Sequence, residues 1–84
     1  MKRKHKKTLE SVFKDPVLSN VIWDDIENLF IALGAEITEG SGSRVRIALN
    51  NVKAVFHRPH PEKETDKGAL KSIRQYLKNA GVKL

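Results

Sequence analysis

The fold of this 84-residue chain is decided by the stretch RVRIALNNVKAVFH, residues 44–57. Apolar side chains alternate with other residues on both sides of Asn50-Asn51, which is the pattern of two half-buried strands. Asparagine tolerates positive φ angles, so Asn50-Asn51 suits a two-residue hairpin loop. Such a loop fixes the register, because residues at equal distances before Asn50 and after Asn51 then face each other.

This register divides the hairpin into two faces. Val45 and Phe56 face each other on the core side, as do Ile47 with Ala54 and Leu49 with Val52. On the other side Arg44 faces His57, and that open face gathers three cations and a histidine: Arg44, Arg46, Lys53 and His57. His60 lies just beyond the strand end. An open face of this composition is typical of a polyanion site. The alternative is an ordinary polar surface that keeps strand edges from aggregating.

The elements on either side of the hairpin predict the fold class. Ala35, Ile37 and Glu39 indicate one more strand, which the turn Gly40–Ser43 joins to the hairpin. Before it, a helix is predicted by an apolar face: Ile22, Ile26, Leu29, Phe30 and Leu33. Asp24 and Asp25 suit the start of this helix and Gly34 suits its end.

After the hairpin, Pro59 and Pro61 end the last strand, and Asp66 can cap a second helix. Its apolar face consists of Ala69, Leu70, Ile73, Tyr76, Leu77 and Ala80. We therefore predict an α+β domain over residues 21–84, with a three-stranded antiparallel sheet and both helices on one sheet face.

Residues 1–20 form a basic extension. Leu9, Val12 and Phe13 indicate a short helix that Thr8 caps and that stops before Pro16. The preceding residues, Met1–Lys7, are expected to be a disordered, solvated tail, and the alternative is a tail that rides on phosphate or anionic lipid.

Composition narrows the function classes. The net charge is +6, distributed as +5 over residues 1–14, −6 over 15–39 and +7 over 40–84. A polyanion should therefore prefer the C-terminal half. The absence of cysteine excludes disulfides, thiolate nucleophiles and cysteine-held metals. No apolar stretch has the ~20 residues that span a bilayer, and no signal-peptide pattern is present. We expect one small cytoplasmic domain without a membrane segment.

The cluster with reactive side chains is His57-Arg58-Pro59-His60-Pro61. A histidine can take a proton from a ribose 2′-hydroxyl, and an arginine can stabilise the charge of the phosphorane that follows. Cations of the last helix can add phosphate contacts: Lys67, Lys71, Arg74 and Lys78. The alternative is that both histidines are merely polar residues at a strand end. A metal site is not expected, because an extended segment points His57 and His60 apart and no third ligand is evident.

The run from Trp23 to Val82 resembles the HicA family of toxins from toxin–antitoxin pairs. The resemblance is carried by Ala32-Leu33-Gly34, by Gly42-Ser43 before the second strand, by His60, and by two segments near the end: Lys67–Ile73 and Asn79–Gly81. It implies a fold like the double-stranded-RNA-binding domain, a metal-independent ribonuclease (mRNA interferase) activity without cofactor, and a HicB-type antitoxin as partner.

One departure from the family matters. Its catalytic histidine follows Gly-Ser in the second strand, and here Gly42-Ser43 is followed by Arg44. Arginine stays protonated and cannot act as a base at neutral pH. Either His57 or His60 has taken over as base, or the domain binds RNA or its partner without cutting. A DNA-binding role is less favoured, since no helix-turn-helix spacing precedes the last helix.

The resulting prediction is an endoribonuclease toxin that acts on single-stranded mRNA. His57 or His60 serves as base, and Arg44 and Arg58 stabilise the phosphorane. The remaining basic residues position the strand, namely Arg46, Lys53, Lys67, Lys71 and Arg74.

Overall fold

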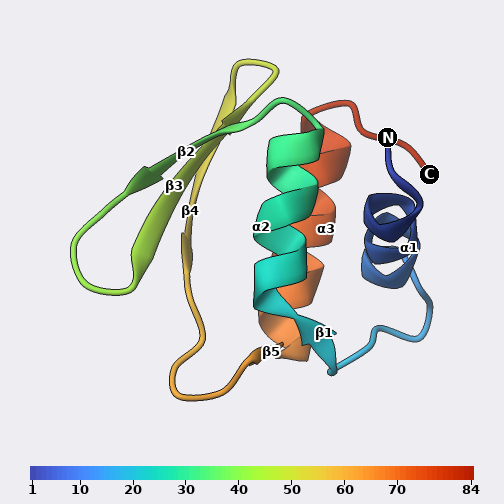
Figure 1. Cartoon of the computed structure of the whole chain (residues 1–84), viewed down its shortest axis with the longest axis horizontal. Coiled ribbons are helices and arrows are strands. Elements are labelled where there is room, and N and C mark those ends of the chain that lie inside the picture. The colour runs from blue at the N-terminus through green and yellow to red at the C-terminus, as the bar shows by residue number, and fades with distance from the viewer.

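The computed structural model describes residues 1–84 and arranges them in three layers (Figure 1). The sheet forms one layer, α2 and α3 form the middle layer, where Phe30 contacts Tyr76, and α1 packs on their far side. In chain order the elements are α1 (Arg3–Val12), β1 (Val21–Ile22), α2 (Trp23–Ala32), β2 (Glu36–Glu39), β3 (Arg44–Leu49), β4 (Val52–His57), β5 (Glu64–Thr65) and α3 (Lys67–Asn79). The predicted α+β class, with two helices on one face of a three-stranded sheet, is confirmed.

The hairpin has the register that the sequence predicted. β3 and β4 are antiparallel with Leu49 opposite Val52 and Arg44 opposite His57. Asn50 and Asn51 both have positive φ, 51° and 66°, as a two-residue loop that follows the strand twist requires. β2 pairs with the other edge of β3, so the sheet order is β2-β3-β4.

The two predicted helices begin and end close to where the sequence placed them. Asp66 caps α3, because its carboxylate accepts a hydrogen bond of 2.7 Å from the Ala69 amide. α2 begins with Asp24 and Asp25 in its first turn, where the helix dipole favours acids. Gly34 follows α2 with a φ of +93°, a conformation that glycine adopts without a steric penalty.

An aromatic cluster joins the sheet to the middle helices. The Phe56 ring of β4 lies between three helical rings, with centroids 6.4 Å from Trp23, 6.2 Å from Phe30 and 5.6 Å from Tyr76. Tyr76 also donates a hydrogen bond of 2.7 Å to the Val52 carbonyl. Since burial disfavours the ionised phenol, the pKa of Tyr76 is raised above its ordinary value. These contacts hold β4 against the helices and leave its other face open.

The N-terminal segment differs from the prediction. Residues 3–7, expected to be a disordered tail, are helical, and α1 starts well before Thr8. The Thr8 hydroxyl does not cap the helix; it donates 3.1 Å back to the Lys4 carbonyl in mid-helix. The reason is packing: Leu9 and Val12 are buried in the same core as α2 and α3. Arg74 of α3 adds two hydrogen bonds, 2.9 Å to the Val12 carbonyl and 2.6 Å to the Lys14 carbonyl.

A second, two-stranded sheet was not predicted. β1 pairs with β5 through Val21–Thr65 and Ile22–Glu64. Strands of two residues are too short to show a period in the sequence. This pair ties the start of α2 to the start of α3.

Candidate nucleic-acid interface

The open face of the sheet carries the predicted cations. Burial alternates along β3, where Val45, Ile47 and Leu49 are buried while Arg44 and Arg46 are exposed. Lys53 and His57 of β4 are exposed as well. Four of the residues predicted to bind or cut RNA therefore share one face, turned away from α2 and α3.

Arg44 and His57 form the closest kind of cross-strand pair. The Arg58 amide donates 2.9 Å to the Ser43 carbonyl, and these two residues face each other in the same register. Hydrogen-bonded and non-hydrogen-bonded pairs alternate along an antiparallel ladder, so the next pair, Arg44 with His57, is of the non-hydrogen-bonded kind. In such pairs the side chains lie closer together. The Arg44 and His57 side chains thus leave the sheet from directly opposite positions on one face, and neither makes a side-chain hydrogen bond.

β2 adds residues to this face that the sequence interpretation did not include. Its register places Glu36 opposite Ala48 and Thr38 opposite Arg46. A shallow hollow of about 420 Å³ lies over the middle of the sheet, lined mainly by Glu36, Thr38, Arg46, Lys53 and Val55. The signal was present, because a core-facing Ile37 implies that its neighbours Glu36 and Thr38 point outward. The Val55 side chain is 54% exposed and gives this hollow an apolar surface on which a nucleobase can pack.

Arg58 lies on the opposite side of the sheet from His57. Its Nε and Nη2 donate 2.6 and 3.0 Å to the Glu27 carboxylate of α2, and Nη1 and Nη2 donate 2.6 and 2.8 Å to Glu39 of β2. Trp23 Nε1 also donates to Glu27. These hydrogen bonds, to Glu27 first and then to Glu39, raise the pKa of Arg58, and the Arg58 guanidinium lowers the pKa of Glu39. The Arg58 guanidinium, which was predicted to stabilise a phosphorane, is instead hydrogen-bonded to two carboxylates.

The remaining predicted residues are spread over other surfaces. Lys67 and Lys71 are exposed on α3, on the helix side of the sheet, and Arg74 is hydrogen-bonded to the end of α1. His60 is exposed in the loop between β4 and β5. The structure therefore brings Arg44, Arg46, Lys53 and His57 together and leaves the others apart.

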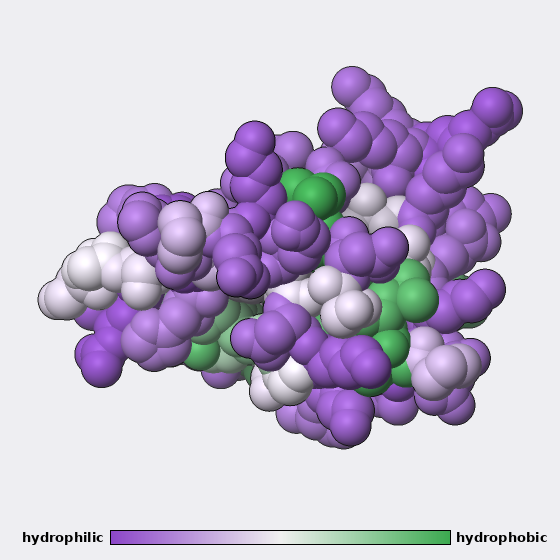
Figure 2. Space-filling model, turned by 90° about the horizontal axis from the view of Figure 1, so that it is seen from below, coloured by the Kyte–Doolittle hydropathy of each residue, from purple (hydrophilic) through white to green (hydrophobic).

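Two further observations concern metals and membranes. No group of three or more histidine, aspartate or glutamate side chains is arranged to hold a metal ion. None of the three helices has both the length and the hydrophobicity that crossing a membrane requires. Seen from below, the surface is mostly hydrophilic, and hydrophobic residues show only as separate small patches (Figure 2).

The sequence was also compared with models of known protein families. The family model of the HicA toxin of bacterial toxin–antitoxin pairs matches residues 23–82. The chain belongs to the HicA toxin family. The match starts at the first residue of α2 and extends past α3, so it includes the whole three-stranded sheet and leaves α1 outside. No curated protein and no solved structure matches the chain.

Proposed function

We propose that this HicA-family toxin is an endoribonuclease that binds single-stranded mRNA on the open face of its sheet. The observation that carries the proposal is the exposed, non-hydrogen-bonded pair of Arg44 and His57. A base and a permanently charged cation side by side are the two groups that 2′-hydroxyl attack on phosphorus requires.

In this mechanism His57 takes the proton of a ribose 2′-hydroxyl. The 2′-oxygen forms a bond to the adjacent phosphorus, and the charge that develops on the phosphoryl oxygens is stabilised by Arg44. The bond from phosphorus to the 5′-oxygen then breaks, and that oxygen takes a proton from solvent. Arg46 and Lys53 hold neighbouring phosphates along the same face. The chemistry needs no metal or cofactor.

Arg58 enters this proposal as a positioning residue. It joins the end of β4 to α2 and β2 directly after His57 in the chain, so it fixes the backbone that carries the base. His60 takes no part in this mechanism, because it lies in the loop beyond β4 and outside the register that places His57 opposite Arg44.

The proposed partners follow from the family. A HicB-type antitoxin would neutralise the toxin, and the place of action would be the cytoplasm, where mRNA is present. The second candidate function is a non-catalytic RNA- or antitoxin-binding module. Arg44 favours it, because it stands where the resemblance places the family's catalytic histidine.

The test is incubation of the purified protein with end-labelled single-stranded RNA in EDTA. We expect cleavage by the wild type, loss of cleavage in His57→Ala and retention in the matched variant His60→Ala. Loss of cleavage in His60→Ala alone would move the base to the loop. Intact RNA in a wild-type preparation that still binds RNA would leave the non-catalytic module.

A further inference from the structure

Helix α1, which the family match leaves out, begins with the densest run of lysine and arginine in the sequence. Its apolar face is buried through Leu9 and Val12, and Arg74 fastens its C-terminal end. Its first residues and the one before it are exposed and basic: Lys2, Arg3, Lys4, Lys6 and Lys7. Packing therefore holds these cations in a fixed arrangement, which reduces the entropy that a ligand must overcome to bind them.

The charges of α1 oppose its own stability as a helix. The N-terminal end of a helix has a partial positive charge and favours acids, yet the first turn of α1 contains none. Arg3 and Lys7 are like charges four residues apart, as are Lys2 and Lys6, a spacing at which they repel each other. Local rules are broken in this way mainly where function requires it. An anion bound to α1 would relieve the repulsion.

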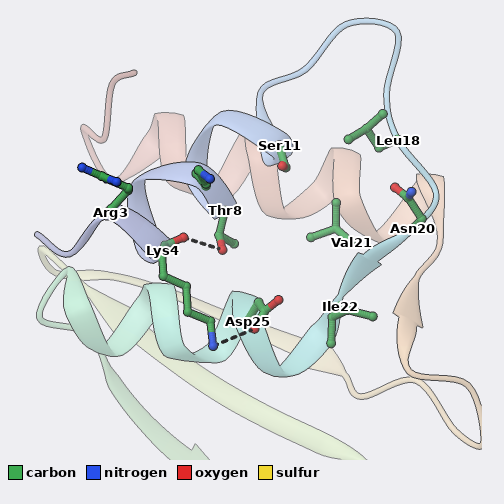
Figure 3. A pocket seen from close by; sticks show the side chains of 10 residues that line it. Arg3, Lys4, Thr8, Ser11, Leu18, Asn20, Val21, Ile22 and Asp25 are labelled. Atoms are coloured by element: carbon green, nitrogen blue, oxygen red, sulfur yellow. Dashed lines mark hydrogen bonds and ion pairs between the residues drawn. The ribbon is translucent and has the colours of Figure 1, made fainter.

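A groove of about 630 Å³ runs between α1 and the segment from Leu18 to Asp25 (Figure 3). Lys4 reaches across it to Asp25, 3.6 Å away, and Thr8 is hydrogen-bonded to the Lys4 carbonyl. The other polar side chains in the lining make no hydrogen bond or ion pair within the chain: Arg3, Lys7, Ser11 and Asn20. All four can donate hydrogen bonds to phosphate oxygens.

We propose that this groove is a second site for the RNA backbone, in which phosphates lie against Arg3 and Lys7. The identification of the polyanion as RNA rests on the proposed function. A membrane surface fits less well, because the apolar face of α1 is buried and nothing remains to insert into lipid. α1 lies on the far side of α2 and α3 from the sheet, so one RNA molecule must pass around the domain to reach both sites. The groove therefore increases affinity for long RNA and leaves the chemistry of short RNA unchanged.

The experiment compares two double variants that remove the same charge from the same helix. Arg3→Gln/Lys7→Gln takes both cations out of the groove. Lys2→Gln/Lys6→Gln is the matched control, with the same spacing on residues that do not line it. Binding is measured with fluorescent 2′-O-methyl RNA of two lengths. One of about 20 nucleotides exceeds the site of about 4–16 nucleotides that a single domain covers, and one of about 4 nucleotides lies at its lower limit. This RNA has no 2′-hydroxyl to attack, so binding is read without cleavage.

We expect the groove variant to lose about tenfold in affinity for the long RNA, with a salt slope smaller by about 1.4, since each single-strand phosphate contact contributes about 0.7. Affinity for the short RNA should stay the same. Both double variants should keep or raise the melting temperature, because each removes a repelling pair. Opposite effects on stability and on binding would separate a ligand site from a structural role.

Two results would overturn the groove site. One is an equal loss of affinity in both double variants, which would mean diffuse attraction to the whole of α1. The other is no loss in either. If His57→Ala abolishes cleavage while the groove variant binds like wild type, only this inference fails. If the wild type binds neither RNA, the proposed function fails with it.

Discussion

His57 and Arg58 are neighbours in the chain, and they belong to two regions that use charge in opposite ways. On the open face, Arg44 and His57 stand free of side-chain partners. At the helix-side end of the sheet, Arg58 has both edges of its guanidinium bound by Glu27 and Glu39. The same kind of side chain is available to a ligand in one region and holds the fold together in the other. Successive residues of a strand point to opposite faces of the sheet. The face to which a side chain points, and not its position along the chain, therefore decides whether a ligand can reach it.

Arg74 of α3 is, like Arg58, a basic residue with a structural role. It was predicted to hold phosphate, and its guanidinium instead donates to the carbonyls of Val12 and Lys14. These two hydrogen bonds hold α1 against the domain. Arg74 therefore helps to position the basic residues of α1. If RNA binds to α1 as proposed, Arg74 supports that binding without touching the RNA.

Among the arginines, Arg44→Ala should lower cleavage most. Removing one donor that stabilises charge in the transition state lowers cleavage by about 10²–10³-fold. The free energy of unfolding should change by less than about 0.5 kcal/mol, because the side chain is exposed and makes no hydrogen bond. Single-turnover cleavage and urea unfolding measure the two quantities. The control is Arg46→Ala, two residues along the same face, which should weaken binding and leave the rate at saturating RNA unchanged.

Arg58→Ala should do the reverse. It leaves the half-buried Glu27 without its cation, so we expect the protein to lose about 1–3 kcal/mol of unfolding free energy. Lysine keeps the positive charge but cannot make the paired hydrogen bonds of a guanidinium. Arg58→Lys should therefore recover only part of this loss. The cleavage rate of the folded fraction should stay within about threefold of wild type, well short of a lost transition-state donor. A fall as deep as that of Arg44→Ala would contradict this separation of roles, because Arg58 would then act on the RNA itself.

The sequence predicted the open face because two local rules determine it. A two-residue Asn-Asn loop sets the register, and a period of two assigns Arg44 and His57 to the same side. Continuing the same alternation one residue further would have placed Arg58 on the helix side. Its partners could not be found in this way, since Glu27 and Glu39 are 31 and 19 residues away.

The start of α1 was not predictable for a similar reason. Its first turn has no capping side chain and no acid, so local propensity indicated a tail. What forms the helix is burial of Leu9 and Val12 against α2 and α3 together with Arg74, which is 62 residues from Val12. Tertiary contacts of this range outweigh an unfavourable local sequence.

The helix side of the sheet should control the stability of the protein at high pH. Tyr76 keeps its proton in the folded protein to a higher pH than in the unfolded chain, since burial raises its pKa. Its contribution is therefore complete below a pH of about 10 and is lost as the pH rises through the folded pKa. Tyr76→Phe should cost about 1 kcal/mol at neutral pH through the lost bond to Val52. Urea unfolding from pH 8 to 11 should show a smaller alkaline decline in this variant, and an unchanged decline would assign it to other groups.

The smallest effect expected is at acid pH, from Glu39. Hydrogen bonds from Arg58 lower the pKa of this carboxyl, so the folded protein binds its proton less readily than the unfolded chain. The stabilisation is present above the ordinary glutamate pKa and is lost as the pH falls through the lowered folded value. Glu39→Gln should flatten this part of the stability curve between pH 5 and 3, by a modest amount because Glu39 is exposed. Glu36→Gln, on the open face of the same strand and without an arginine partner, is the matched control. An equal flattening in both variants would show that the acid dependence comes from general charge and not from the occupied fork of Arg58.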